Sequence, residues 1–277
     1  MKQNLKFYLK NKLSRKELAL VPSSFDVVGN IMIFSDFPKE LFKKEKIIGQ
    51  TILQNYHHIK TILKKTKKYS GKYRTAKLKV ITGEDRKETI HKENDVLMKL
   101  DVEKVYFSPR MSSERKRIAD LINPNESVLV MFSGSGVYPL VIAKNSKAKD
   151  VYGVEINPTA HKYALENIKK NKLENKIRLF LGDVKKVMPK LNKKFNRILM
   201  PLPKGGEGFL YLTLKYIKNK GTIHFYDFLH EDEFYKAEEK IKNACEKSRK
   251  KYKILGIVRC GQYSPGFYRI CADFEAN

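Results

Sequence analysis

The pattern of apolar and polar residues changes character near residue 123. Before this point the apolar runs are short and either alternate with polar residues or are rich in β-branched ones, as in VVGNIMIF (27–34), AKLKVITG (76–83) and VLMKLDVEKVYFS (96–108). Such runs predict antiparallel, half-exposed strands. Residues 45–57 predict an amphipathic helix, and the basic stretch KKTKKYSGKYR (64–74) predicts an exposed loop. We therefore expect a small α+β domain over residues 1–100.

After Pro124 the pattern becomes a repeated succession of strand, turn and helix. Buried strands are predicted at 127–133, 150–156, 176–183, 196–203 and 221–228, and helices at 137–146, 158–173, 209–220 and 232–251. This alternation predicts a mostly parallel sheet covered on both faces, as in a Rossmann-like α/β domain. We expect that domain over residues 123–277, preceded by a connecting segment over 101–122 with a helix at about 109–122.

The charge balance narrows the choice of partners. The chain has 57 Lys and Arg against 30 Asp and Glu, which gives a formal net charge of +27. Such a charge favours a polyanionic partner such as nucleic acid, although a generally lysine-rich composition remains the alternative. No apolar run approaches the roughly 20 residues that span a bilayer, and the N-terminus lacks a secretion signal. The three cysteines have no paired spacing, so we expect no disulfide framework or metal site and a cytoplasmic location.

The stretch VMFSGSGVYP (130–139) places two glycines directly after a predicted strand. Ligands of open α/β sheets bind beyond the carboxyl ends of the strands, and glycines allow the backbone to approach them closely. A dinucleotide fingerprint needs a third glycine where this chain has Pro139, and no phosphate-binding P-loop is present. Acids end the next two predicted strands, Glu155 for a ribose diol and Asp183 for an adenine amine. This order predicts S-adenosylmethionine, bound by Ser133, Gly134, Gly136, Glu155, Ile156, Asp183 and Val184.

Three longer stretches, LVPSSFDVVGNIMIF, GKYRTAKLKVITGEDRKETIHKENDVLMKLDVEKVYFSPRMSSER and VMFSGSGVYPLVIA, carry a family resemblance. Together they resemble the archaeal and eukaryotic tRNA (guanine-37-N1)-methyltransferases over about residues 20–274. The resemblance implies methyl transfer from S-adenosylmethionine to N1 of guanosine 37. The aminocarboxypropyltransferases of wybutosine synthesis are similar, but their F-S-P-x-N segment differs from the S-P-R of this chain. That transfer and a non-catalytic tRNA-binding role remain the alternatives.

The resemblance also implies roles for individual residues. Glu114 matches the proposed base that removes the guanine N1 proton, and Arg74 matches the arginine thought to hold O6. A carboxylate at N1 and a guanidinium at O6 would stabilise the purine anion as it forms. Tyr106, Phe107 and Arg110 match the wall beside the cofactor.

The chain departs from the family pattern in two places, and the first concerns substrate range. Pro201-Leu202-Pro203 stands where many members read Asn-Leu-Pro, so that Pro201 offers only a carbonyl at the cofactor and the target base. Some archaeal members with Pro-Leu-Pro resemble enzymes that also methylate C7 of the wyosine precursor imG-14. Only about 20 residues precede VPSSFD, so we also expect the usual N-terminal tRNA-docking module to be missing.

Lysines interleaved with Tyr69 and Tyr73 predict contact with the tRNA anticodon arm, because cations bind phosphates and aromatic rings stack on unpaired bases. The candidate lysines are Lys64, Lys65, Lys67, Lys68 and Lys72. An anticodon-loop base must also be swung out to reach a buried pocket. We expect the protein to act as a monomer, without a membrane partner.

Overall fold

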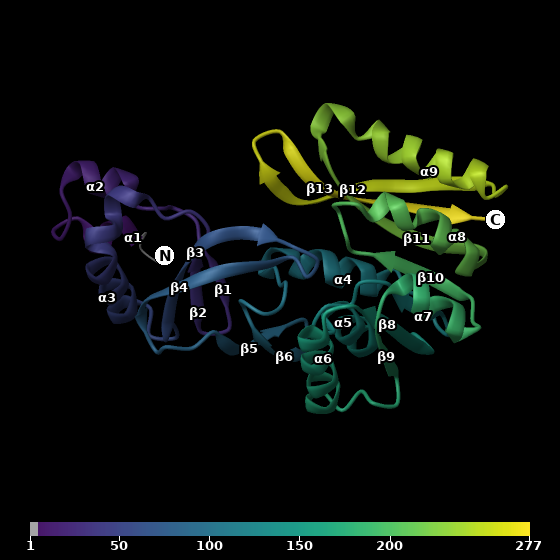
Figure 1. Cartoon of the computed structure of the whole chain (residues 1–277), viewed down its shortest axis with the longest axis horizontal. Coiled ribbons are helices and arrows are strands. Elements are labelled where there is room, and N and C mark those ends of the chain that lie inside the picture. The colour runs from purple at the N-terminus through teal and green to yellow at the C-terminus, as the bar shows by residue number, and fades with distance from the viewer. Residues whose placement is uncertain (1–4) are drawn as a thin grey trace. The chain divides into compact units, whose positions relative to one another are not determined.

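The computed structural model describes residues 5–277, except for the side chain of Lys68, and the chain forms two compact units (Figure 1). Unit 1 comprises the chain up to Lys92 together with Leu97–Pro109, and unit 2 comprises Glu93–Val96 together with Arg110–Asn277. The helix expected to connect two domains therefore belongs to unit 2. Among residues 5–277, no helix has the length and apolar content needed to cross a bilayer.

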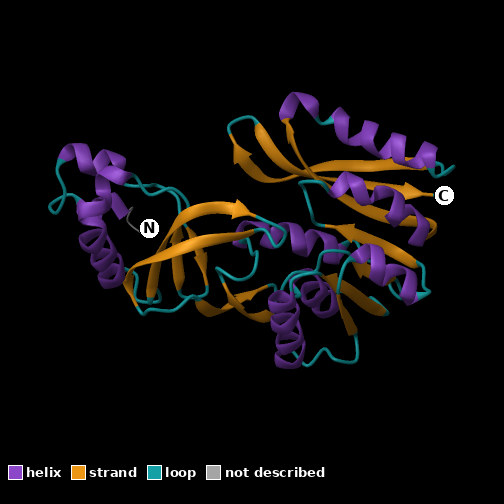
Figure 2. Cartoon of the chain, in the orientation of Figure 1, coloured by secondary structure: helices purple, strands orange, loops and turns teal. Residues whose placement is uncertain are grey.

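Unit 1 is built on a four-stranded sheet with the order β1-β2-β3-β4 (Figure 2). The strands are β1 (Asp26–Val28), β2 (Ile31–Phe34), β3 (Thr61–Ser70) and β4 (Thr75–Gly83), and only the β2–β3 pairing of this described sheet is parallel. Helices α1 (Leu5–Leu9), α2 (Arg15–Leu20) and α3 (Glu45–Asn55) and the 3₁₀ turn η1 (Lys39–Lys44) accompany it. Leu9, Ile48 and Ile62 join helices and sheet in one apolar core. Helix α3 confirms the helix predicted over 45–57.

The exposed loop predicted over 64–74 is wrong. Strand β3 continues through Ser70, and β4 follows after a tight turn that contains Gly71 (φ +72°) and Arg74 (φ +51°). The lysines misled the prediction, because a strand that projects from its sheet can carry charged side chains on a solvated face. The hairpin of β5 (Glu88–Glu93) and β6 (Val96–Asp101) forms a separate two-stranded sheet.

Unit 2 contains a seven-stranded sheet with the order β12-β13-β11-β10-β7-β8-β9. The strands are β7 (Ser127–Val130), β8 (Asp150–Glu155), β9 (Ile177–Leu181), β10 (Phe195–Met200), β11 (Ile217–His230), β12 (Tyr252–Ser264) and β13 (Phe267–Ala276). Five neighbouring strands, β9 to β11 in this order, are parallel, and β13 is inserted antiparallel between β11 and β12. The mostly parallel sheet is thus confirmed.

Helices cover both faces of this sheet, as predicted (Figures 1 and 2). One face carries α7 (Val184–Leu191), α8 (Leu210–Tyr216) and α9 (Tyr235–Lys247), and the other carries α4 (Ser112–Asp120), α5 (Val137–Asn145) and α6 (Pro158–Lys170). The short 3₁₀ turns are η2 (Pro109–Met111), η3 (Gly206–Phe209) and η4 (Glu231–Glu233). The helix predicted over 209–220 ends at Tyr216, because the buried Ile217 pairs with Phe195 and begins β11.

Strand alternation gives the two faces different chemistry. In β11, Ile223 and Phe225 join the apolar core beneath α7, α8 and α9, so His224 and Tyr226 point to the face of α4 and α5. In β13, Phe274 joins the same core and leaves Asp273 on the α4 and α5 face. Buried polar side chains therefore gather on one side of the sheet, where each needs a hydrogen-bond partner.

Candidate active site

The glycine turn lies where the strand order reverses, since β7 pairs with β8 on one side and with β10 on the other. This is the position at which open α/β sheets bind ligands. Gly134 (φ +56°) and Gly136 (φ +84°) adopt left-handed backbone conformations, and Gly136 directly precedes α5. A Cβ atom on Gly136 would lie 3.1 Å from the Cβ of Ala164 in α6, so glycine also permits the close packing of that helix.

Two buried serine hydroxyls belong to this turn. Ser133 and Ser135 are 4% and 0% exposed, and within the described chain neither hydroxyl oxygen has a hydrogen-bond partner. Gly153 of β8 makes room beside them, since a Cβ there would lie 3.0 Å from that of Ser133. A buried polar atom without a partner costs free energy, which a ligand with hydrogen-bonding groups would recover.

Glu155 ends β8 beside the same turn. Its carboxylate accepts hydrogen bonds from the backbone nitrogens of Gly134 (2.7 Å) and Asn157 (2.7 Å). Burial raises the pKa of Glu155, while these backbone hydrogen bonds act in the opposite direction. A carboxylate has about four acceptor positions, so it can still accept from a ribose diol. The structure thus brings together the predicted turn and the predicted ribose acid, with Ile156 next in the chain.

Asp183 and Val184 lie at the end of the neighbouring strand. The backbone nitrogen of Gly182 donates to the Glu155 carbonyl (2.8 Å), which fixes the two strand ends side by side. Asp183 is half-buried, and its carboxylate caps α7 by accepting from the Lys185 nitrogen (2.9 Å). Its remaining lone pairs suit an adenine amine.

Pro201 follows β10 at the same edge of the sheet. The Leu202 nitrogen donates to the Met200 carbonyl (2.7 Å), which makes a tight turn, and Pro201 is half-buried. Because β10 pairs with β7, the Pro201–Pro203 turn and the glycine turn follow adjacent strands.

Glu114 lies in the first turn of α4 and is 4% exposed. Its carboxylate accepts from Arg117 Nε (2.7 Å) and Nη2 (2.8 Å) and from the Tyr226 hydroxyl (2.6 Å). The Arg117 guanidinium also pairs with Asp273 (2.6 Å) and so balances two buried carboxylates. Although burial alone would lower it, the hydrogen bonds with Glu114 and Asp273 raise the pKa of Arg117.

His224, Cys271 and Asp273 bring three potential metal-ligating atoms within 4.8 Å of one another. Their contacts do not suit a metal ion, because the two His224 nitrogens contact Asp273 (2.6 Å) and Arg197 (2.8 Å), and the Cys271 thiol donates to Asp273 (3.1 Å). Arg117 and Arg197 also place two positive charges beside the group, which would repel a cation.

Arg74, Tyr106 and Phe107 belong to unit 1, whereas Arg110 and Glu114 belong to unit 2. Arg74 is exposed in the turn between β3 and β4. Tyr106 contacts Tyr69 edge-on, with ring centroids 5.0 Å apart, and the buried Phe107 packs against His91 at 5.1 Å. The ring contacts of Tyr106 and Phe107 are thus both made within unit 1.

The lysines of β3 do not all face solvent. Lys64 is buried, forms an ion pair with Glu45 and lies 3.5 Å from the centre of the Phe42 ring, so its placement on an exposed surface is wrong. Alternation explains this, because Lys64 shares the helix-facing side of β3 with Ile62. Lys67 and Lys72 are exposed, and Lys65 is half-buried over Tyr69. The side chain of Lys68 lies outside the described residues.

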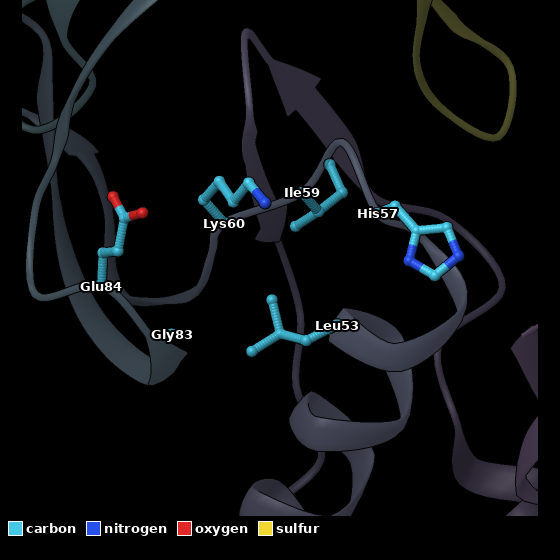
Figure 3. A pocket seen from close by; sticks show the side chains of 6 residues that line it. All are labelled: Leu53, His57, Ile59, Lys60, Gly83 and Glu84. Atoms are coloured by element: carbon cyan, nitrogen blue, oxygen red, sulfur yellow. The ribbon is translucent and has the colours of Figure 1, made fainter.

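A pocket of about 420 Å³ lies in unit 1 (Figure 3). Leu53 of α3, the segment before β3 and the end of β4 line it, with His57, Lys60 and Glu84 as its polar side chains. None of the predicted site residues contributes to its lining.

Several polar residues of unit 2 were absent from the predicted site: Ser135, His224, Tyr226 and Asp273. Ser135 lies between the two glycines and was open to prediction from its position. His224 and Tyr226 occupy alternate positions of the otherwise apolar run GTIHFYDF, and this period was the available signal.

The chain is similar to known proteins along its length. Residues 89–255 match the TRM5/TYW2 methyltransferase domain, and residues 5–86 match the TYW2 N-terminal domain. The chain is 40% identical over 258 residues to the tRNA (guanine(37)-N(1))-methyltransferase Trm5b of Pyrococcus abyssi, covering 93% of this chain and 76% of that protein. It is 33% identical to the tRNA (guanine(37)-N(1))/4-demethylwyosine(37)-methyltransferase Taw22 of Nanoarchaeum equitans, covering 87% and 97%.

Solved structures show the same similarity. The structure of aTrm5 in complex with tRNALeu superimposes with a TM-score of 0.88 at 32% identity, over 100% of this chain and 79% of that one. The structure of M. jannaschii TYW2 in complex with AdoMet gives a TM-score of 0.69 at 30% identity, over 92% and 99%.

Proposed function

Because the chain belongs to the TRM5/TYW2 methyltransferase family, we propose that it transfers a methyl group from S-adenosylmethionine to N1 of guanosine 37 in tRNA. The observation that carries this proposal is the glycine turn at the point of strand reversal, with two buried serine hydroxyls and Glu155 around it. This arrangement suits an adenosine-bearing ligand, and the named activity of the similar Trm5b specifies the reaction.

The cofactor supplies an electrophilic methyl group on a positively charged sulfur. In unit 2, Ser133, Gly134 and Gly136 with Glu155 would hold its ribose side, and Asp183 and Val184 would hold its adenine. The family resemblance adds Arg110 and the Pro201 carbonyl to these residues of unit 2. The assignments at the glycine turn, Glu155 and Asp183 rest on the geometry of unit 2, and the other assignments rest on the family resemblance.

Glu114 acts as the base in this proposal. Guanine N1 carries a proton at neutral pH and is a poor nucleophile until that proton is removed. Arg117 and Tyr226 donate three hydrogen bonds to the Glu114 carboxylate, and in this proposal the guanine N1–H is a further donor to it. Arg74 would balance the charge that then develops on O6.

The β3–β4 hairpin of unit 1 supplies tRNA contacts in this proposal. Lys67, Lys72 and Arg74 are exposed around Tyr69 and Tyr73, which are 38% and 42% exposed. Cations on phosphates combined with aromatic rings on splayed bases are typical of loop recognition in RNA. We further propose that the protein acts as a monomer in the cytoplasm, consistent with the free state of Cys245, Cys260 and Cys271.

A second methylation is supported by Pro201-Leu202-Pro203. This motif replaces the asparagine that many guanosine-37 methyltransferases carry, and the similar Taw22 is named for both guanosine and 4-demethylwyosine methylation. We therefore propose C7 of imG-14 as an additional target atom.

Mass spectrometry of nucleosides tests both activities. The purified protein is incubated with S-adenosylmethionine and either a tRNA transcript with guanosine 37 or a tRNA that carries imG-14, and an adenosine-37 transcript serves as the control. We expect 1-methylguanosine from the first and a gain of one methyl group on the second. A gain of an aminocarboxypropyl group, or no change in the guanosine-37 transcript, would contradict the proposal.

A further inference from the structure

We propose that Tyr226 and Arg117 are positioning residues that fix the Glu114 carboxylate for proton transfer, and that Asp273, His224 and Arg197 hold Arg117 in place. The inference rests on the proposed role of Glu114 as the base. All of these residues lie in unit 2, on α4, β10, β11 and β13 (Figure 1).

The first support is the direct grip on Glu114 from two elements. Arg117 binds the carboxylate through two parallel N–H donors one helical turn away on α4, at 2.7 and 2.8 Å. Tyr226 reaches it from β11 at 2.6 Å, and the Tyr138 hydroxyl donates in turn to that of Tyr226 (3.1 Å). A fork of two donors fixes the plane of the carboxylate, and the third donor fixes its position along the sheet.

The second support is the series of hydrogen-bonded side chains that holds Arg117. Its Nη1 donates to Asp273 Oδ2 (2.6 Å), and the other oxygen of Asp273 contacts His224 Nδ1 (2.6 Å). Arg197 Nη1 lies 2.8 Å from His224 Nε2, and Arg197 is bound by Glu126 at 2.6 and 3.1 Å. Carboxylates and guanidiniums therefore alternate from Glu114 to Glu126, with one imidazole between them.

The donors in this hydrogen-bond series determine which nitrogen of His224 carries the proton. A guanidinium only donates, so His224 Nε2 accepts from Arg197, and Nδ1 carries the proton and donates to Asp273. Burial lowers the pKa of His224, although Asp273 opposes the shift, so the ring is neutral. The donor and acceptor of each hydrogen bond in the series are thus fixed, from Arg197 through His224 to Asp273.

This series of hydrogen bonds extends from Glu114 to the C-terminal end of α4. Arg197 Nη2 also donates to the Leu121 carbonyl at the end of α4 (2.8 Å), and Tyr138 lies one residue into α5, directly after the glycine turn. The position of Glu114 is therefore coupled both to the C-terminal end of its own helix and to the helix that starts at the cofactor turn.

Several titratable groups face Glu114 and bear on its pH dependence. They are Arg117 on α4, Tyr138 on α5, Tyr226 on β11, Cys260 on β12 and Cys271 on β13. Burial, and secondly the charge of Glu114, raise the pKa of the Tyr138 hydroxyl and the Cys260 thiol. Burial likewise raises the pKa of Tyr226 and Cys271, so these four groups stay neutral across the working pH range.

The test is the pH dependence of single-turnover methylation by wild type and by Tyr226→Phe, with cofactor affinity measured separately by calorimetry. The variant keeps the ring and deletes one donor to a charged group, so we expect the rate at neutral pH to fall about 10- to 100-fold. Loss of a donor to the carboxylate also moves the acid limb of the profile to higher pH. The dissociation constant for S-adenosylmethionine stays within twofold.

Tyr152→Phe is the matched control. It also deletes a buried hydroxyl of unit 2, one that accepts from Arg178 (2.8 Å), and it leaves the Glu114 contacts intact. We expect no shift of the acid limb in this variant. If the wild type is active and Tyr226→Phe shows the same rate and the same acid limb as the wild type, the inference is overturned.

Crystal structures of wild type and Tyr226→Phe separate this inference from the proposed function. Absence of methyl transfer by the wild type would refute the function of Glu114 and not its placement. The Glu114 carboxylate is expected to be displaced or rotated in the variant. An unchanged Glu114 side chain in both crystals would overturn the inference whatever the activity.

Discussion

Replacing Glu93 with Gln tests whether a buried ion pair secures the helix that carries Glu114. Glu93 ends β5 and binds Arg115 of α4 through two contacts of 2.5 and 2.6 Å, and both side chains are 4% exposed. Glutamine keeps the volume but removes the negative charge that faces the buried Arg115 guanidinium. Breaking one partner of such a pair costs about 3–5 kcal/mol of unfolding free energy.

Thermal unfolding followed by far-UV circular dichroism measures this cost. In a unit of this size 1 kcal/mol corresponds to about 2–4 °C, so we expect the melting temperature of unit 2 to fall by about 6–20 °C. Asp120→Asn is the control on the same helix, because Lys116 and Asp120 pair at the surface with 43% and 55% exposure. That pair contributes about 0–1 kcal/mol. Equal shifts in the two variants, or less than about 2 °C for Glu93→Gln, would refute the reasoning.

Four further predictions follow from individual residues. Glu114→Gln should bind S-adenosylmethionine normally in calorimetry but lose about 10²- to 10⁴-fold in single-turnover rate, as expected for a missing base; an unchanged rate would remove Glu114 as the base. Gly153→Ala should weaken cofactor binding, because its Cβ would lie 2.5 Å from Leu179 Cδ2 and 3.0 Å from the Cβ of Ser133 in the glycine turn; unaltered affinity would contradict that close approach. Burial lowers the pKa of His224 from its ordinary 6.5, so the stability linked to its neutral form is present above pH 6.5 and is lost as the pH falls below it. The unfolding free energy measured with urea should therefore decrease less between neutral and acidic pH in His224→Asn than in the wild type. An equal decrease in both proteins would refute the assignment. Replacing Lys67 and Lys72 together with Ala should reduce the salt dependence of tRNA binding by about 1.5 in slope, and an unchanged slope would exclude phosphate contacts there.

Elements with strong local signals were predictable from the sequence. Helix α6 begins where expected, because Asn157 caps it by accepting from Thr159 and Ala160 and Pro158 suits its first turn. The end of β8 was likewise predictable, since an apolar run ends in one acid, and this placed Glu155 beside the glycine turn.

The errors have physical causes of their own. Strand β3 carries lysines along a projecting hairpin, where tertiary pairing with β4 outweighs its composition. Helix α7 was not predicted, because it is short, rich in lysine and contains Pro189.

The contacts around Glu114 were beyond prediction from local pattern. Tyr226 and Asp273 lie 112 and 156 positions from their partners on α4, so no periodicity along the chain relates them. What the sequence did contain was the alternation of polar side chains within β11, which indicates a buried polar face but not its partner. The family resemblance therefore proposed Glu114 as the base, whereas only the fold locates the residues that hold its carboxylate.

The most direct test of the account is the position of S-adenosylmethionine in a crystal of this protein. We expect the ribose hydroxyls on Glu155, the adenine near Asp183, and new hydrogen bonds to at least one of the Ser133 and Ser135 hydroxyls. A cofactor bound away from the turn at Ser133–Gly136, or a ribose that makes no contact with Glu155, would contradict the central claim.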